Sequence, residues 1–421
     1  MQLTPTPDHR DKDACTTAGA AGVSLVDLLG RLGQKAREFR FEVAPNPCVG
    51  AAVLSAGRVI ACGFTAPWGG PHAEVEALAA AAAAGTGVPK ERWDTLVVTL
   101  EPCSSTGKTG PCTQAILDAG IKRVVVGALD PDPRHQGAGI ELLRAAGIEV
   151  EFIPARPGSL GSWALEDVAR HFVDWTAPER VRRPRPWLIA KWAQTLTGQL
   201  TPPEDVGEGR WISGPASLHE VHRLRGQVDA ILTGVGTVKA DDPRLSVRLP
   251  GDTTRQPLRV VFDSYLTTPP DARLFADPAP EFDATGARLE NQGEVVIFSK
   301  SGPDAGRYRS LEATGARIVT LPGGDDGRIS LRAATDWLWD QGVRRSLLEA
   351  GPVLTRAFHD ADLLDQVRVY SGNVVGGRGT TLAPLIHELL DRDRLIGSRL
   401  DRESGVDVDP ELGDAVIELF S

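Results

Sequence analysis

Four residues in the first third of the chain have side chains and a spacing that suit a catalytic zinc site. They are His72 and Glu74 in a His-Ala-Glu segment, Cys103 in a Pro-Cys segment, and Cys112. One imidazole and two thiolates give zinc three protein ligands and leave the fourth tetrahedral position for water. Glu74 can move a proton between that water and a departing amine, as in the His-x-Glu and Pro-Cys signature of zinc deaminases. The pattern therefore predicts hydrolytic removal of an amino group.

The spacing of the two cysteines narrows the class of substrate. Eight residues separate Cys103 from Cys112, whereas nucleobase deaminases usually carry Cys-x-x-Cys. The net charge of −10 also offers no basic face for a phosphate backbone. A deaminase of free or polymeric nucleobases is therefore disfavoured, and no nucleic-acid partner is expected.

Composition indicates a globular protein with more than one domain. The 421 residues are 41% hydrophobic and 24% charged, and no apolar run approaches membrane-spanning length. Residues 1–24 form a polar start without the pattern of a signal peptide, so we expect a polar tail and a cytoplasmic protein. Cys48 and Cys62 lie in apolar segments and are expected to be buried thiols.

Periodicity predicts a layered α/β domain over residues 25–176 that positions the zinc residues. A hairpin turning at Ala56-Gly57 precedes His72, and a buried strand delivers Cys103. The predicted helices are 25–39, 73–84 and 112–120, and the predicted strands are 48–55, 59–64, 95–100 and 122–129.

Residues 177–186 alternate arginine with proline and are interpreted as a solvated linker. A second α/β pattern then runs over residues 187–421, and its density of strands predicts a mostly parallel sheet that binds ligands beyond its strand ends. No G-x-G-x-x-G follows its first strand, so no dinucleotide fingerprint of that kind is present.

From about residue 25 to the end, the chain resembles the bifunctional deaminase–reductase family of riboflavin biosynthesis. The motifs that carry the resemblance include Pro71-His72-Ala73-Glu74-Val75, Thr99-Leu100-Glu101-Pro102-Cys103, Gly107-Lys108-Thr109, Pro111-Cys112, His222-Arg223-Leu224-Arg225, Gly236-Thr237-Val238, Ala240-Asp241-Asp242-Pro243 and Glu349-Ala350-Gly351-Pro352. The eight-residue cysteine spacing is also the family's.

The resemblance implies a cytidine-deaminase-like three-layer domain followed by a dihydrofolate-reductase-like domain. The first would deaminate 2,5-diamino-6-(5-phosphoribosylamino)pyrimidin-4-one with Zn²⁺, and the second would reduce the ribosyl group to ribitol with NADPH. The implied cofactor contacts are Ala193, Trp211, Thr237, Asp241, Gly351, Pro352, Val353, Leu354, Thr355, Arg356 and Ala357. The implied substrate contacts are Asn46, Lys108, Gly209, Arg225, Leu245, Arg248 and Glu349.

These assignments make chemical sense. Arg225 and Arg248 can hold a phosphate by charge-assisted hydrogen bonds, and Glu349 can bind ribose hydroxyls. Reducing an opened ribose needs a hydride on carbon and a proton on oxygen, so Lys191 or Asp241 is the expected catalytic proton carrier.

The chain departs from the family pattern at Thr197, where an aspartate is usual, and at Gly209, where a serine is usual. These departures leave an alternative open, namely an active zinc deaminase whose reductase-like half is only structural. NADPH binding separates the two hypotheses. A homo-oligomer is expected in either case.

Overall fold

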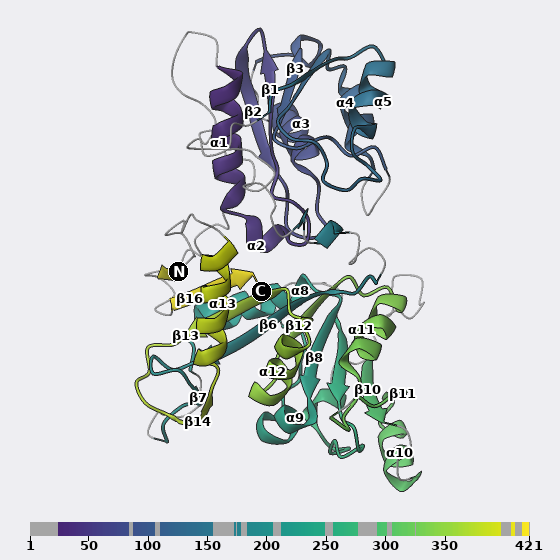
Figure 1. The fold of residues 1–421 in the computed structure, drawn as a ribbon, viewed down its shortest axis with the longest axis vertical. Helices are drawn as coiled ribbons and strands as arrows, with labels where there is room; N and C mark the ends of the chain where they lie inside the picture. The colour runs from purple at the N-terminus through teal and green to yellow at the C-terminus, as the bar shows by residue number, and fades with distance from the viewer. Residues whose placement is uncertain are drawn as a thin grey trace. The chain divides into compact units, whose positions relative to one another are not determined.

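The structure, a computed structural model, divides into two compact units, residues 1–182 and 183–421 (Figure 1). It describes residues 24–83, 87–105, 110–154, 172–173, 175–177, 183–204, 212–248, 256–276, 293–300, 305–324, 326–396, 406–408 and 415–420.

The first unit is built on a five-stranded sheet in the order β2-β1-β3-β4-β5. β1 is antiparallel to both of its neighbours, whereas β3, β4 and β5 are parallel. The strands are β1 (Gly50–Ser55), β2 (Arg58–Phe64), β3 (Thr95–Val98), β4 (Arg123–Val126) and β5 (Glu149–Phe152). The helices are α1 (Leu25–Arg37), α2 (Arg40–Val43), α3 (Ala73–Ala83), the 3₁₀ turn η1 (Lys90–Arg92), α4 (Cys112–Ala119) and α5 (Ala138–Ala145).

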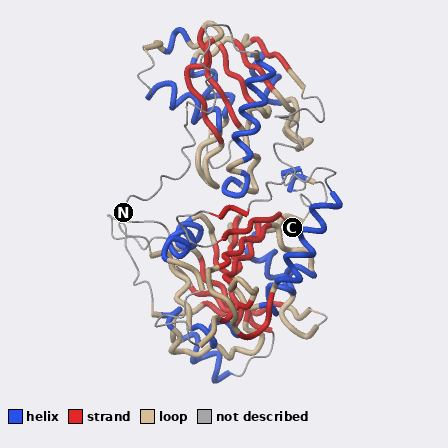
Figure 2. Tube along the Cα trace, turned by 90° about the vertical axis from the view of Figure 1, so that its left-hand side faces the viewer, coloured by secondary structure: helices blue, strands red, loops and turns tan. Residues whose placement is uncertain are grey.

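Two glycines show that helices cover both faces of this sheet. A Cβ on Gly50 would lie 2.8 Å from the carbonyl oxygen of Leu32 in α1, and a Cβ on Gly63 would lie 2.2 Å from the amide nitrogen of Ala77 in α3. Gly50 pairs with Phe64 across β1 and β2, so Gly50 and Gly63 present opposite faces of the pleat. The three-layer arrangement predicted for this domain is confirmed, and Figure 2 shows helices on both sides of the strands.

The hairpin before the zinc residues turns where the sequence predicts. Ala56 and Gly57 both have positive φ, 47° and 75°, which is the requirement of a type I′ turn and the reason for glycine at the second position. Cys48 is a buried free cysteine, as expected. Cys62 is disulfide-bonded, so the prediction of a thiol is wrong at that position.

The second unit is built on a nine-stranded sheet in the order β11-β10-β9-β8-β12-β6-β13-β16-β15. The strands from β11 to β13 in this order are parallel, and β16 runs antiparallel to β13 and β15. The strands are β6 (Trp187–Gln194), β8 (Ala230–Gly234), β9 (Leu258–Phe262), β10 (Val295–Lys300), β11 (Arg317–Leu321), β12 (Arg345–Leu348), β13 (Gln366–Ser371), β15 (Val406–Val408) and β16 (Ala415–Phe420). A separate pair is formed by β7 (Gln199–Thr201) and β14 (Arg378–Thr381). The helices are α8 (Pro215–Gly226), α9 (Val235–Asp241), η2 (Arg273–Phe275), α10 (Ala305–Glu312), α11 (Leu331–Asp340), α12 (Pro352–Asp360) and α13 (Ala383–Ile396).

The two faces of this sheet have different neighbours. Alternate residues of β6, among them Leu188 and Ala190, pack in one cluster with residues of α11, α12 and α13. Residues on the other face pack with α8, α9 and α10, as Ala193 does beside Val221 of α8. Because side chains alternate along a strand, Lys191 lies on the same face as Ala193. The prediction of a mostly parallel sheet with helices on its faces is confirmed.

Arg185, which the sequence places in a solvated linker, is instead a buried part of the second unit. Its guanidinium pairs with both carboxylate oxygens of Asp365, at 2.7 and 3.0 Å, and the Leu188 amide donates to the same carboxylate. Only 4% of Arg185 is exposed, so the interpretation of a solvated arginine is wrong here. Among the described helices, none combines the length and apolar character needed to cross a membrane.

Candidate functional site

The structure brings the three predicted zinc ligands together. The Nδ1 atom of His72 lies 3.6 Å from Sγ of Cys103 and 3.3 Å from Sγ of Cys112, and the three ligand atoms all lie within 4.8 Å of one another. Zinc bonds of about 2.0 Å to nitrogen and about 2.3 Å to sulfur, at tetrahedral angles, place nitrogen about 3.5 Å from sulfur. The donor set and its spacing therefore fit a zinc ion.

Sheet topology explains why residues distant in sequence meet. His72 follows β2, Cys103 follows β3, and Cys112 begins α4. Since β2 and β3 both run antiparallel to β1, their carboxyl ends lie at the same edge of the sheet. Asn46 lies just before β1 and so belongs to that edge too. Lys108 lies outside the described residues.

Glu74, the predicted acid/base, is a buried residue in the first turn of α3, only 4% exposed. Burial raises the pKa of its carboxyl group, against the opposing effect of His72. The pKa of Cys103 shifts in the opposite direction, because hydrogen bonds with Cys112 and His72 lower it.

In the second unit, Arg225, Glu349 and Lys191 form one buried ionic group. Arg225 of α8 donates from Nε and Nη2 to the two carboxylate oxygens of Glu349, at 2.6 and 2.9 Å. The Lys191 ammonium of β6 lies 3.9 Å from the same carboxylate. The remaining nitrogen of Arg225, Nη1, donates to the Ser246 carbonyl. The side chain predicted to bind phosphate is therefore engaged with Glu349 and the backbone.

The charges of this group shift one another's pKa values. Burial alone would raise the pKa of Glu349, but Arg225 and Lys191 outweigh it and hold that pKa at about 2. Burial lowers the pKa of Lys191, and Arg225 adds to this effect while Glu349 opposes it. A lysine with a lowered pKa releases its proton more easily, as the predicted proton carrier requires.

Arg248, exposed and next to this group, is better placed to meet an anion from solvent. Its Nη1 donates to Oγ of Ser246 at 3.0 Å, and its amide donates to Nδ1 of His222 at 3.2 Å. Burial, together with Arg225 and Arg248, lowers the pKa of His222 to about 4. Ser246 links both arginines although it does not belong to the predicted site. Leu245, which does belong to it, is buried and has a positive φ of 55°.

The predicted cofactor contacts lie mainly at the carboxyl ends of β8 and β12. The Gly351 amide, just before α12, donates to Oγ1 of Thr237 in α9 at 3.0 Å. Val353 in the first turn of α12 is 61% exposed, so the beginning of this helix is open to a ligand. These are the strand ends at which parallel sheets bind nucleotides, and the residues here fit the cofactor.

Other residues of the predicted cofactor set have varied surroundings. Thr355 is buried and donates to the Ala350 carbonyl, while Arg356 pairs with Asp360 and Glu388 beside α13. Asp241 ends α9, and burial raises its pKa. Pro352, Leu354 and Ala357 complete the first turns of α12. Trp211 and Gly209 lie outside the described residues.

Thr197, where the chain departs from the family pattern, has a defined structural role. Its Oγ1 donates to the Gly376 carbonyl and accepts from the Gly376 amide, both at 3.0 Å. It thereby joins the β6–β7 turn to the segment before β14.

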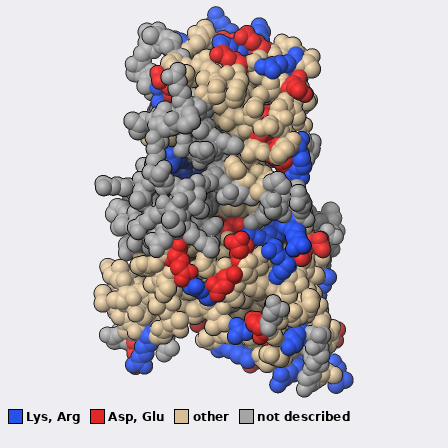
Figure 3. Space-filling view, in the orientation of Figure 1, with Lys and Arg blue, Asp and Glu red and all other residues tan. Residues whose placement is uncertain are grey.

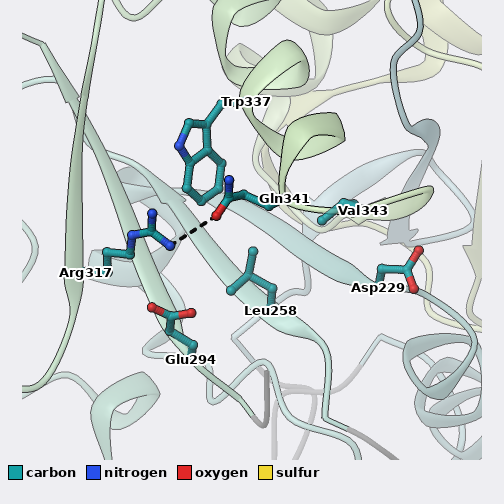
Figure 4. A pocket seen from close by; sticks show the side chains of 8 residues that line it. Asp229, Leu258, Glu294, Arg317, Trp337, Gln341 and Val343 are labelled. Carbon is teal, nitrogen blue, oxygen red and sulfur yellow. Dashed lines mark hydrogen bonds between the residues drawn. The ribbon is translucent and has the colours of Figure 1, made fainter. Parts of the chain in front are cut away.

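A hollow lies at the opposite edge of the second sheet from this group (Figure 4). Apart from Trp337 of α11, its lining residues precede or begin parallel strands, as Asp229 does for β8 and Leu258 for β9, whereas Glu349 follows β12. Arg317 donates to Gln341 across it and stacks on Trp337 at 5.2 Å. None of the described residues of the predicted site lines this hollow.

The described surface has no broad basic stripe on the face seen in Figure 3, where Lys and Arg side chains lie beside Asp and Glu.

Each of the two units matches a known protein family. The cytidine and deoxycytidylate deaminase zinc-binding region matches residues 31–128, and the RibD C-terminal domain matches residues 186–390. Together with the ligand triad of the first unit and the sheet of the second, these matches define a bifunctional zinc-dependent deaminase and reductase. The predicted fold class is confirmed.

Relatives of similar length extend the match over both units. The riboflavin biosynthesis protein RibD of Aquifex aeolicus is 33% identical over 81% of this chain and 85% of its own length. That of Corynebacterium ammoniagenes is 35% identical over 84% of this chain and 86% of its own length. The chain belongs to the RibD family. It is accordingly an enzyme of riboflavin biosynthesis, and Zn²⁺ and NADPH are its cofactors.

Solved structures agree with this assignment. Acinetobacter baumannii RibD, form 1, has a TM-score of 0.58 at 26% identity and covers 94% of this chain and 99% of its own. A Thermotoga maritima diaminohydroxyphosphoribosylaminopyrimidine deaminase/5-amino-6-(5-phosphoribosylamino)uracil reductase has a TM-score of 0.57 at 27% identity, with the same coverage.

Proposed function

We propose that the first unit deaminates 2,5-diamino-6-(5-phosphoribosylamino)pyrimidin-4-one and that the second reduces the ribosyl group of the product to ribitol. The observation that carries this proposal is the convergence of His72, Cys103 and Cys112 beside the buried Glu74. Two further observations favour this substrate over a nucleobase. Eight residues separate Cys103 from Cys112, and the second unit contains the ionic group around Glu349.

In the first unit, His72, Cys103 and Cys112 would hold zinc, which lowers the pKa of a bound water. Glu74 accepts a proton from the attacking water and delivers it to the amine, which leaves as ammonia while the carbon becomes a carbonyl. Burial favours the protonated form of Glu74 between the two transfers. Asn46, at the same sheet edge, and Lys108 would contact the pyrimidine and the phosphate.

In the second unit, the Glu349 carboxylate is held rigidly by Arg225 and is placed to accept hydrogen bonds from ribose hydroxyls. Lys191 supplies a proton to the carbonyl oxygen of the opened ribose as a hydride reaches its carbon. Arg248 binds the phosphate, and Leu245 and Gly209 complete the substrate contacts. Thr237, Asp241, Ala193, Trp211 and the segment 351–357 hold NADPH.

The same proposal includes a cytoplasmic homo-oligomer. Leu196 and Val375 are 54% and 70% exposed, and the Leu196 amide donates to the carbonyl of Val374 beside Val375. Two neighbouring apolar side chains on the surface favour contact with a second copy. Light scattering on a sizing column tests this, and a monomeric mass at micromolar concentration would reject it.

The test of function follows ammonia release and NADPH oxidation together, using zinc-loaded protein and the diaminopyrimidine substrate. We expect both signals, with NADPH oxidation dependent on prior deamination. Ammonia without NADPH oxidation would favour the alternative of a structural second unit. If protein that retains zinc gives neither ammonia release nor NADPH oxidation, the proposed substrate is wrong.

A further inference from the structure

Glu101, two residues before the zinc ligand Cys103, has a buried carboxylate that accepts hydrogen bonds from four backbone amides. Its oxygens accept from the amides of Gly137 at 2.9 Å, Gly139 at 3.0 Å, Asp130 at 3.2 Å and Ile140 at 3.3 Å. Only 5% of the residue is exposed. Gly137 is the N-cap of α5, and Gly139 and Ile140 lie in its first turn, so the carboxylate binds amides that have no partner within the helix.

The backbone beside Glu101 is also in direct contact with α5. A Cβ built on Gly139 would lie 2.1 Å from the carbonyl oxygen of Pro102, a separation that no side chain can adopt without a shift of backbone. Gly139 has no positive φ that would call for glycine. Glycine is therefore needed here because α5 packs on the peptide that joins Pro102 to Cys103.

Cys103 itself lies in a segment without helix or strand, so its neighbours determine its position. On one side, the amide of Cys112 donates to Cys103 Sγ at 3.3 Å, and the amide of Thr113 donates to its carbonyl at 3.2 Å. On the other side, Glu101 and Pro102 are held against α5. The ligand thus sits between α4 and α5.

We propose that Glu101, with the space left by Gly139, positions Cys103 for metal binding. The proposal rests on the zinc site of the proposed function and adds a positioning residue to it. Groups that fix a ligand from outside typically change metal affinity or activity by about 10- to 100-fold when they are lost.

Two variants test this proposal in the full chain. Glu101→Gln turns an amide NH₂ group toward N–H donors and so removes about half of the hydrogen bonds to the carboxylate. Gly139→Ala pushes α5 away from Pro102 and leaves the Glu101 side chain unaltered. Glu141→Gln is the matched control, since Glu141 lies exposed on the same helix and undergoes the same chemical change.

The main readout is the rate of zinc release to a chromogenic chelator, with the kcat and KM of deamination measured beside it. Both variants should release zinc about 10- to 100-fold faster and lose kcat more than they raise KM. Glu141→Gln should match the unmodified chain, and NADPH oxidation with pre-deaminated substrate should be unchanged in all three variants.

Unchanged zinc release in Glu101→Gln and Gly139→Ala would overturn the proposal. So would equally accelerated hydrogen exchange across all strands of the deaminase sheet, because that would show general destabilisation instead. An unmodified chain that binds no zinc would refute the proposed function itself, so the two failures are distinguishable.

Discussion

Removing Arg225 should leave Glu349 as a buried carboxylate without its bidentate partner. Their side chains are 11% and 13% exposed and are joined by bonds of 2.6 and 2.9 Å. We therefore expect Arg225→Met to destabilise the reductase unit, and Glu349→Gln to do so at least as much, because it leaves the buried Arg225 and Lys191 cations without an anion.

The size of the effect follows from the pKa of Glu349. The environment lowers that pKa from an ordinary value of 4.5 to about 2, and at about 1.36 kcal/mol per pKa unit this equals about 3 kcal/mol of stabilisation of the ionised form. Breaking a buried pair by removing one partner costs about 3–5 kcal/mol in general. Lys191, 3.9 Å away, compensates in part, so we expect a cost near the lower figure.

The pH dependence has a definite sign. A carboxylate with a depressed pKa contributes its full stabilisation above the unfolded pKa, here 4.5, and loses it as pH falls toward the folded value of about 2. The difference in stability between the unmodified chain and Arg225→Met should therefore be constant near neutral pH and shrink below pH 4.5.

The assay is hydrogen exchange of the β8 and β12 amides in the full chain, which reports the free energy of opening of this unit alone. Arg225→Met, Glu349→Gln and the double variant form a cycle with the unmodified chain. We expect a coupling energy of about 2–3 kcal/mol at neutral pH. Single costs that simply add in the double variant would refute the reasoning.

Three further predictions concern individual residues. Glu74→Gln should reduce ammonia release by roughly 10²- to 10⁴-fold while zinc content and NADPH oxidation of pre-deaminated substrate stay unchanged; loss of zinc would contradict the role as proton carrier. Arg248→Ala should raise the KM of the phosphorylated substrate by about 10- to 100-fold with little change in kcat, and an equal rise with the dephosphorylated compound would contradict phosphate binding. Thr197→Val removes two hydrogen bonds to Gly376, so hydrogen exchange at the Gly376 amide should accelerate without any effect on deamination; an unchanged exchange rate would show that those bonds do not hold the segment.

The zinc site could be predicted because the types of its side chains determine by themselves which metal they can bind. An imidazole, two thiolates and a carboxylate at fixed spacing specify a ligand set before any fold is known. The hairpin at Ala56-Gly57 and the parallel second sheet could be predicted for a similar reason, since turn residues and strand periodicity act locally.

What could not be predicted depends on partners distant in sequence or on backbone. Arg225 meets a carboxylate 124 positions away, and nothing local distinguishes an arginine that binds phosphate from one that holds a glutamate. Arg185, among prolines and other arginines, gave no sign of Asp365. Glu101 binds amides, which every residue but proline possesses, so residue types carry no signal for that contact.

The contact between Gly63 and α3 bears on how the evolutionary record of this protein is read. A Cβ there would meet backbone atoms of Ala73, Glu76 and Ala77 at 2.7 Å or less, and every other amino acid carries a Cβ. Because α3 also carries Glu74, a substitution at Gly63 would displace the helix that supplies the proton carrier. In a growth selection, Gly63 would therefore tolerate replacement as poorly as Glu74 does. A position can therefore reject substitution either because its side chain reacts or because there is no room for a larger residue beside the active site. Assays that measure zinc content separately from turnover can distinguish these two causes.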